Sequence, residues 1–125
     1  MNILILENSP KRIAWFREHF AGETLMITSS PDVAIELLTL TEFDRIYLDH
    51  DLLDWHLTCD ATCDKTTGLA VAKFLAESKA SPESIITIHS LHRAGAERMR
   101  QALWEANRNC LLTPIDKLSN NKVRS

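Results

Sequence analysis

The chain has 125 residues, a mass of 14.2 kDa and a formal net charge of -3, which limits it to about one domain. Hydrophobic residues make up 45% and charged residues 25%, which excludes a disordered chain, and no apolar run reaches the ~18 residues of a membrane helix. The start MNILILENSPKR lacks the basic lead-in of a signal peptide, and three cysteines are few and odd in number. We therefore expect a cytoplasmic protein without a disulfide scaffold.

Short apolar runs alternate with longer amphipathic runs along the chain. The first run, Asn2 to Leu6, is continuously apolar and predicts a strand buried on both faces. Further strands are expected over 24–28, 45–48, 84–88 and 110–113. Helices are expected from Pro10 to about Phe20, from Pro31 through Leu38, and over 68–79 and 93–107, with Ser-Pro pairs opening the first two.

This alternation predicts an α/β fold in three layers, with an open five-stranded parallel sheet between helices on both faces. We expect the domain to span 1–115, followed by a loose polar tail over 116–125.

Polar side chains follow four of the expected strands. Because the carboxyl ends of parallel strands share one rim, where such sheets bind ligands, we expect these side chains to converge. Carboxylates and imidazoles gathered in this way predict a divalent cation site. The oxygen ligands suit Mg²⁺, Mn²⁺ or Ca²⁺ and the imidazoles widen the choice to iron or Zn²⁺, with Mg²⁺ or Mn²⁺ favoured. The set comprises Glu7, Asn8, Asp49, His50, Asp51, His89, Ser90, His92 and Thr113.

The Asp49-His50-Asp51 triplet is the densest part of this set. If the strand continues to residue 51, Asp49 and Asp51 point to one side and His50 to the other. A structural role is therefore a stronger alternative for His50 than for the two carboxylates.

Two helix starts are candidate phosphate sites. Thr67 and Gly68 open one helix, where free backbone N–H groups could hold an anion, although an ordinary N-cap is an equal alternative. Arg93 opens the next helix, directly after Ser90 and His92. A glycine-rich phosphate loop and a G-x-S-x-G nucleophile elbow are both absent from the sequence.

The polar segment 52–66 contains His56, Cys59 and Cys63, spaced as H-x2-C-x3-C. This spacing resembles part of a zinc site, but it supplies three ligands where a structural zinc ion takes four. Free thiols in a loop are the alternative.

Four segments carry a family resemblance: ILENSPKRIAWFREHF, YLDHDL, TTGLAVAKFLAE and IITIHSLHRAGAERM. An acid after the first strand, Asp49 after the third, Ser90 after the fourth and Pro114 after the fifth resemble the layout of response-regulator receiver domains. This resemblance implies their receiver- or flavodoxin-like three-layer sandwich, here with a fifth helix that is missing or rudimentary. The DHD triplet, the Thr-Gly pair and the HS motif resemble more closely a divergent branch, the cyclic-phosphate processing receiver domains. Departures are Asn8 for a second acid, His92 for an asparagine and Thr113 for a receiver lysine.

The resemblance implies a metal-dependent phosphoesterase acting on cyclic phosphates of nucleotides or RNA ends; many small members of this branch are phage-encoded. Glu7, Asp49 and Asp51 would hold the metal, with His89 as general acid or base and His50 as a further catalytic candidate. Thr67, Gly68, Ser90, His92 and Arg93 would contact phosphate. The alternative is a non-catalytic receiver-like module that binds a protein or a nucleotide; in one variant of it, Asp49 accepts a phosphoryl group.

Overall fold

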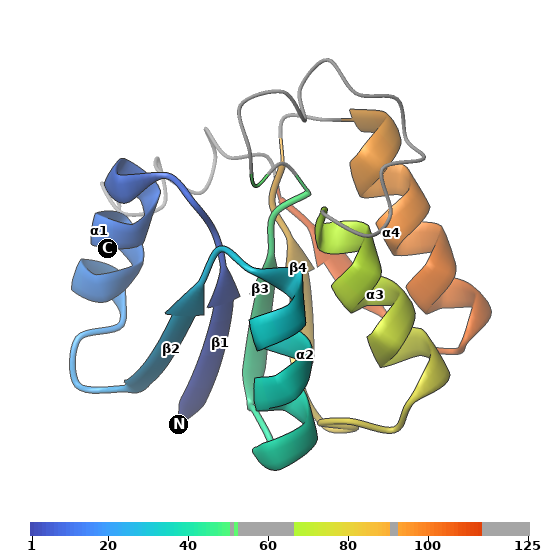
Figure 1. Ribbon diagram of the computed structural model, residues 1–125, viewed down its shortest axis with the longest axis horizontal. Helices are drawn as coiled ribbons and strands as arrows, with labels where there is room; N and C mark the ends of the chain where they lie inside the picture. Colours follow the sequence, from blue (N-terminus) through green and yellow to red (C-terminus); the bar gives the residue numbers. More distant parts are fainter. Residues whose placement is uncertain (51, 53–66, 91–92, 114–125) are drawn as a thin grey trace.

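The computed structural model describes residues 1–50, 52, 67–90 and 93–113. Five parallel strands form one sheet in the order β2-β1-β3-β4-β5, as Figure 1 shows. The predicted parallel α/β architecture is therefore confirmed. The strands are β1 (Asn2–Leu6), β2 (Thr24–Thr28), β3 (Arg45–Leu48), β4 (Ile85–Ile88) and β5 (Cys110–Leu112).

Four helices connect the strands: α1 (Pro10–His19), α2 (Pro31–Leu40), α3 (Gly68–Glu77) and α4 (Arg93–Glu105). The first three begin at side-chain caps. Ser9 Oγ accepts from the Arg12 amide at 3.4 Å, Ser30 Oγ from the Val33 amide at 3.3 Å, and Thr67 Oγ1 from the Leu69 amide at 3.3 Å. In α1 and α2 a proline fills the first helical position, where its missing N–H costs nothing.

The helices cover the two faces of the sheet unequally. Side chains of α2, α3 and α4 pack with Leu4, Leu6 and Leu48 in one buried cluster. On the other face, α1 packs with Ile3, Ile5 and Tyr47 in a second, aromatic-rich cluster. Consecutive strand residues alternate between these clusters, so the parity of a position decides which face its side chain joins.

The described residues end at 113, one position after β5, so the expectation of a missing or rudimentary fifth helix lies outside them. The described part of the chain contains no helix long and apolar enough to cross a membrane. The predicted tail over 116–125 and the segment 53–66, with the partial zinc motif of His56, Cys59 and Cys63, lie outside the described residues.

Candidate functional site

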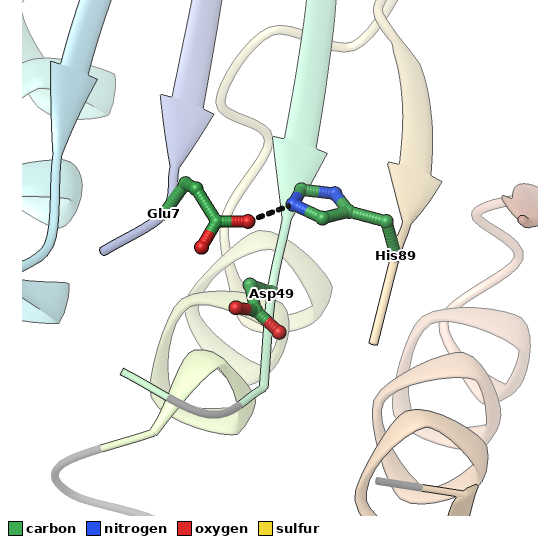
Figure 2. A group of neighbouring side chains, drawn as sticks. All are labelled: Glu7, Asp49 and His89. Carbon is green, nitrogen blue, oxygen red and sulfur yellow. Dashed lines mark hydrogen bonds and ion pairs between the residues drawn. The ribbon is translucent and has the colours of Figure 1, made fainter. Parts of the chain in front are cut away.

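Three buried polar side chains meet at the carboxyl ends of β1, β3 and β4: Glu7, Asp49 and His89 (Figure 2). Each extends the face that packs under α1, because Ile5 pairs with Tyr47 and Tyr47 with Thr87 in the sheet register, two residues earlier in each strand. The three side chains are 0%, 1% and 0% exposed. Three of the side chains expected to converge at this rim are thus together, on the α1 face.

Glu7 is the centre of this group. Its Oε1 lies 3.0 Å from His89 Nε2 and accepts a hydrogen bond from Arg12 Nε at 2.7 Å. Its Oε2 accepts from Arg12 Nη2 at 3.0 Å and from the backbone amides of Asn8 and Ser9 at 2.9 and 3.0 Å. Arg12 Nη2 also lies 3.4 Å from Asp49 Oδ2, so one guanidinium contacts both carboxylates.

These donors decide the protonation of Glu7. Burial alone would raise its pKa, but the hydrogen bonds from His89 and Arg12 outweigh burial and lower the pKa to about 2. Burial would likewise lower the pKa of Arg12, and its contacts with Glu7 and Asp49 raise it instead. Glu7 is therefore a carboxylate at neutral pH, beside a charged guanidinium.

The donor set fits a small divalent cation. One ligand atom each from Glu7, Asp49 and His89 lies within 4.8 Å of the other two. Two ligands at right angles, each about 2.1 Å from a Mg²⁺ ion, would stand about 3.0 Å apart, and the Glu7 Oε1 to His89 Nε2 distance is 3.0 Å. Two carboxylates suit Mg²⁺ or Mn²⁺, and the added imidazole suits Zn²⁺.

His89 is held by aromatic neighbours as well as by Glu7. Its ring centroid lies 5.4 Å from that of Phe16 on α1 and 6.3 Å from that of Tyr47 on β3. Its Nδ1 is buried and has no hydrogen-bond partner among the described residues. The packing fixes the ring with Nε2 toward the carboxylates (Figure 2).

The structure does not bring His50 into this group. His50 is fully buried, and a Cβ added to Gly95 of α4 would lie 2.4 Å from its ring. This contact with α4 places the imidazole on the face opposite α1, as strand alternation requires. His50 packs between the sheet and α4.

Thr67 and Gly68 are engaged within the fold. Thr67 is fully buried and caps α3, and the Gly68 amide donates to the His50 carbonyl at 3.1 Å. A Cβ at Gly68 would lie 2.0 Å from the Asp49 carbonyl oxygen. Gly68 thus lets α3 approach the end of β3, and its N–H is not directed at a ligand.

The other predicted phosphate residues lie nearer the surface. Ser90 is half-buried directly after His89, and Arg93 is exposed at the start of α4. Asp51 and His92 fall outside the described residues. Asn8 contributes its backbone amide to Glu7, and Thr113 donates its amide to the Ile88 carbonyl at 2.9 Å.

Arg12 is the site residue that the sequence reasoning missed. A Lys-Arg pair on an amphipathic helix is typical of a solvated face, yet this side chain turns back onto Glu7. A signal was present: Arg12 lies in the first turn of its helix, where the macrodipole disfavours a cation. A nearby carboxylate resolves that conflict.

The topology and the acidic rim define a receiver-like α/β domain, and solved structures agree. Over 98% of the chain, it is similar to a CheY-like receiver domain from Methylobacillus flagellatus (21% identity, 94% of that chain, TM-score 0.61). It is similar over 98% to the Thermotoga maritima response regulator TrrA in complex with Mg²⁺ and BeF (16%, 96% of that chain, TM-score 0.61). A third match, at 98% coverage, is a Pseudomonas aeruginosa sensor histidine kinase receiver domain with a coordinated magnesium ion (13%, 94%, TM-score 0.62).

Residues 5–105 match the cyclic-phosphate processing receiver domain family, and the chain belongs to that family. The resemblance expected from the DHD, Thr-Gly and HS segments is therefore confirmed. A comparison with curated proteins finds no match.

Proposed function

We propose that this domain is a metal-dependent phosphoesterase that opens cyclic phosphates of nucleotides or RNA ends. The observation that carries the proposal is the buried group of Glu7, Asp49 and His89 at the carboxyl rim of the sheet. Membership of a family described by cyclic-phosphate processing supports the substrate class. Two relatives of the same fold are described with magnesium, which supports the cofactor class.

Glu7, Asp49 and His89 would hold a divalent ion, Mg²⁺ or Mn²⁺, with Asp51 as a further carboxylate ligand. Such an ion polarises a phosphoryl oxygen and lowers the pKa of a bound water. In the reaction, a water molecule would lose one proton as its oxygen bonds to phosphorus, and one ring P–O bond would break. The freed ring oxygen takes up a proton, and the product is a phosphomonoester next to a free hydroxyl group.

If Asp51 rather than His89 completes the metal site, His89 would instead serve as the proton carrier. Imidazole is suited to this because it titrates near neutral pH. Ser90 and Arg93 follow β4 and open α4, so we propose them as contacts for the phosphate oxygens, together with His92. The internal hydrogen bonds of Thr67 and Gly68 favour a structural role for those two residues.

The test is hydrolysis of 2′,3′-cyclic nucleotides with Mn²⁺ or Mg²⁺, followed by ³¹P NMR. We expect turnover by the native chain, and a fall of at least about 10²-fold in Asp49→Asn and His89→Gln. Asp44→Asn is the matched control, because Asp44 is exposed at the opposite end of β3. Wild-type turnover by both site variants would contradict the assignment.

Absence of turnover in a folded, metal-binding protein would favour the non-catalytic alternative, a receiver-like module that binds a protein or a nucleotide. In one variant of that alternative Asp49 accepts a phosphoryl group, and incubation with acetyl phosphate followed by intact-mass measurement tests this variant. A mass gain of one phosphoryl group that Asp49→Asn abolishes would support the variant. An unchanged mass would remove the variant and leave the binding module.

A further inference from the structure

The Glu7 carboxylate is already filled by hydrogen-bond donors. Arg12 Nε and His89 Nε2 both lie at Oε1, while Arg12 Nη2 and two backbone amides donate to Oε2. A carboxylate oxygen offers about two lone pairs. A cation that binds Oε1 must therefore displace one of the two side chains that face this atom.

Arg12 and His89 differ in how they can respond to a cation. His89 can keep its place, because imidazole with its proton on Nδ1 offers the Nε2 lone pair as a ligand. A guanidinium has no lone pair to offer and stays charged, so it cannot become a ligand. Arg12 is thus the group that a cation must move.

Arg12 is also the member of the group whose side chain reaches solvent. Its side chain is 25% exposed, whereas those of Glu7 and Asp49 are 0% and 1% exposed. Its backbone amide is fixed by the Ser9 cap, so only the flexible side chain needs to rotate outward. The guanidinium therefore lies between the buried carboxylates and the solvent.

The position of this guanidinium explains how two like charges remain buried together. Nη2 of Arg12 lies 3.0 Å from Glu7 Oε2 and 3.4 Å from Asp49 Oδ2, so one positive charge offsets both carboxylates. A divalent ion would do the same with a stronger charge. The two cations serve the same pair of acids, and they compete for it.

From this geometry we infer that Arg12 is a built-in counter-ion that a divalent cation must displace from Glu7, so that Arg12 sets the metal affinity of the site. This inference rests on the cation site proposed above. Its consequence is counter-intuitive, because removal of a residue that contacts both metal ligands should strengthen metal binding.

The experiment is Mn²⁺ titration by isothermal calorimetry on the native chain and on Arg12→Gln, Arg12→Lys and Arg17→Gln. A unit charge about 5 Å from a divalent ion opposes its binding by about tenfold even in a high dielectric. We therefore expect Arg12→Gln to bind Mn²⁺ about tenfold or more tightly than the native chain. Arg12→Lys keeps the charge but loses the forked donors, so we expect a smaller gain.

Arg17→Gln is the matched control, because Arg17 is an exposed arginine on the same helix. Its Mn²⁺ affinity should stay within about twofold of the native value, since exposed charges are screened by salt. Circular dichroism of each variant shows whether it is folded, and Arg12→Lys preserves the test if Arg12→Gln does not fold.

The outcomes separate the counter-ion from the metal site itself. Equal or weaker Mn²⁺ affinity in both folded Arg12 variants, beside measurable binding by the native chain, would overturn the counter-ion role and leave the metal site intact. Lack of binding in every folded variant would remove the metal site on which both proposals depend. Binding that appears only when Arg12 is replaced would support the counter-ion role most directly.

Discussion

Replacement of Glu7 by glutamine keeps the shape of the side chain and removes the charge at the centre of the site. The pKa of Glu7 is lowered from an ordinary 4.5 to about 2, so the folded protein favours the carboxylate over the neutral form. At 1.36 kcal/mol per pKa unit, this preference amounts to about 3 kcal/mol. The glutamine amide can be oriented in two ways. With its NH₂ group at the position of Oε2, it faces the three N–H donors there; with the NH₂ group at the position of Oε1, the contacts with Arg12 Nε and His89 Nε2 are lost.

We therefore expect Glu7→Gln to lower the free energy of unfolding by about 3 kcal/mol at pH 7, within the range for breaking one side of a buried ion pair. The assay is urea unfolding followed by circular dichroism in the presence of EDTA. Glu97→Gln is the control, because Glu97 is an exposed residue paired with Arg100, and its replacement should change stability by about 0.5 kcal/mol or less.

The pH dependence provides a second check on the same variant. Because the folded pKa of Glu7 is lowered, its stabilisation is fully present above about pH 4.5 and is lost as the pH falls toward 2. The difference in stability between the native chain and Glu7→Gln should shrink over that interval. A difference below about 0.5 kcal/mol at pH 7, or one that does not change with pH, would refute the electrostatic account.

Two further predictions concern the frame around the site. Arg108→Ala should lower the free energy of unfolding by about 2 kcal/mol in urea titration, because the guanidinium donates to three backbone carbonyls and the Ser84 hydroxyl; an unchanged midpoint would contradict this. Gly68→Ala should cost about 2 kcal/mol or more in the same assay, because its Cβ would lie 2.0 Å from the Asp49 backbone oxygen. A stabilised Gly68→Ala, the usual result in helices, would show that this contact relaxes.

The fold could be predicted from the sequence because its signals are local and periodic. Continuous apolar runs mark the buried strands, and the Ser9-Pro10 and Ser30-Pro31 pairs mark two helix starts that the caps confirm. The ends of the helices were predicted less closely than their starts: α4 ends at Glu105, whereas the sequence predicts a helix to 107. On α1 the buried side chains are Trp15 and Phe16, and Ile13 is only half-buried.

The strand ends of the site could be predicted because topology alone brings them together. Glu7, Asp49 and His89 follow neighbouring strands and share one parity, so a parallel sheet places them on one face. The part played by Arg12 could not be derived in this way. A long side chain reaches in many directions from its helix, and its final contact depends on packing rather than on sequence spacing.

The role of Gly68 is a second feature that the sequence alone does not determine. A Thr-Gly pair before a helix fits a phosphate cradle and a close helix–strand contact equally well at the level of sequence. The structure distinguishes them, because the Gly68 amide is bonded to the His50 carbonyl and the missing Cβ makes room for Asp49. Gly95 makes room for the His50 ring in the same way. Both glycines determine how closely α3 and α4 approach the rim.

Arg12 would have opposite effects on the two ligands that the proposed reaction requires. Counted as two carboxylates and one guanidinium, the formal charges of Glu7, Asp49 and Arg12 sum to about -1, and a bound divalent ion would raise that sum to about +1. Without Arg12 both sums would be one unit lower. In the proposed site, the guanidinium would therefore weaken the binding of the cation and strengthen the attraction for a phosphodiester anion. A site that must bind both ligands and then release a more negatively charged monoester gains from such a compromise, because neither charge is then bound too tightly.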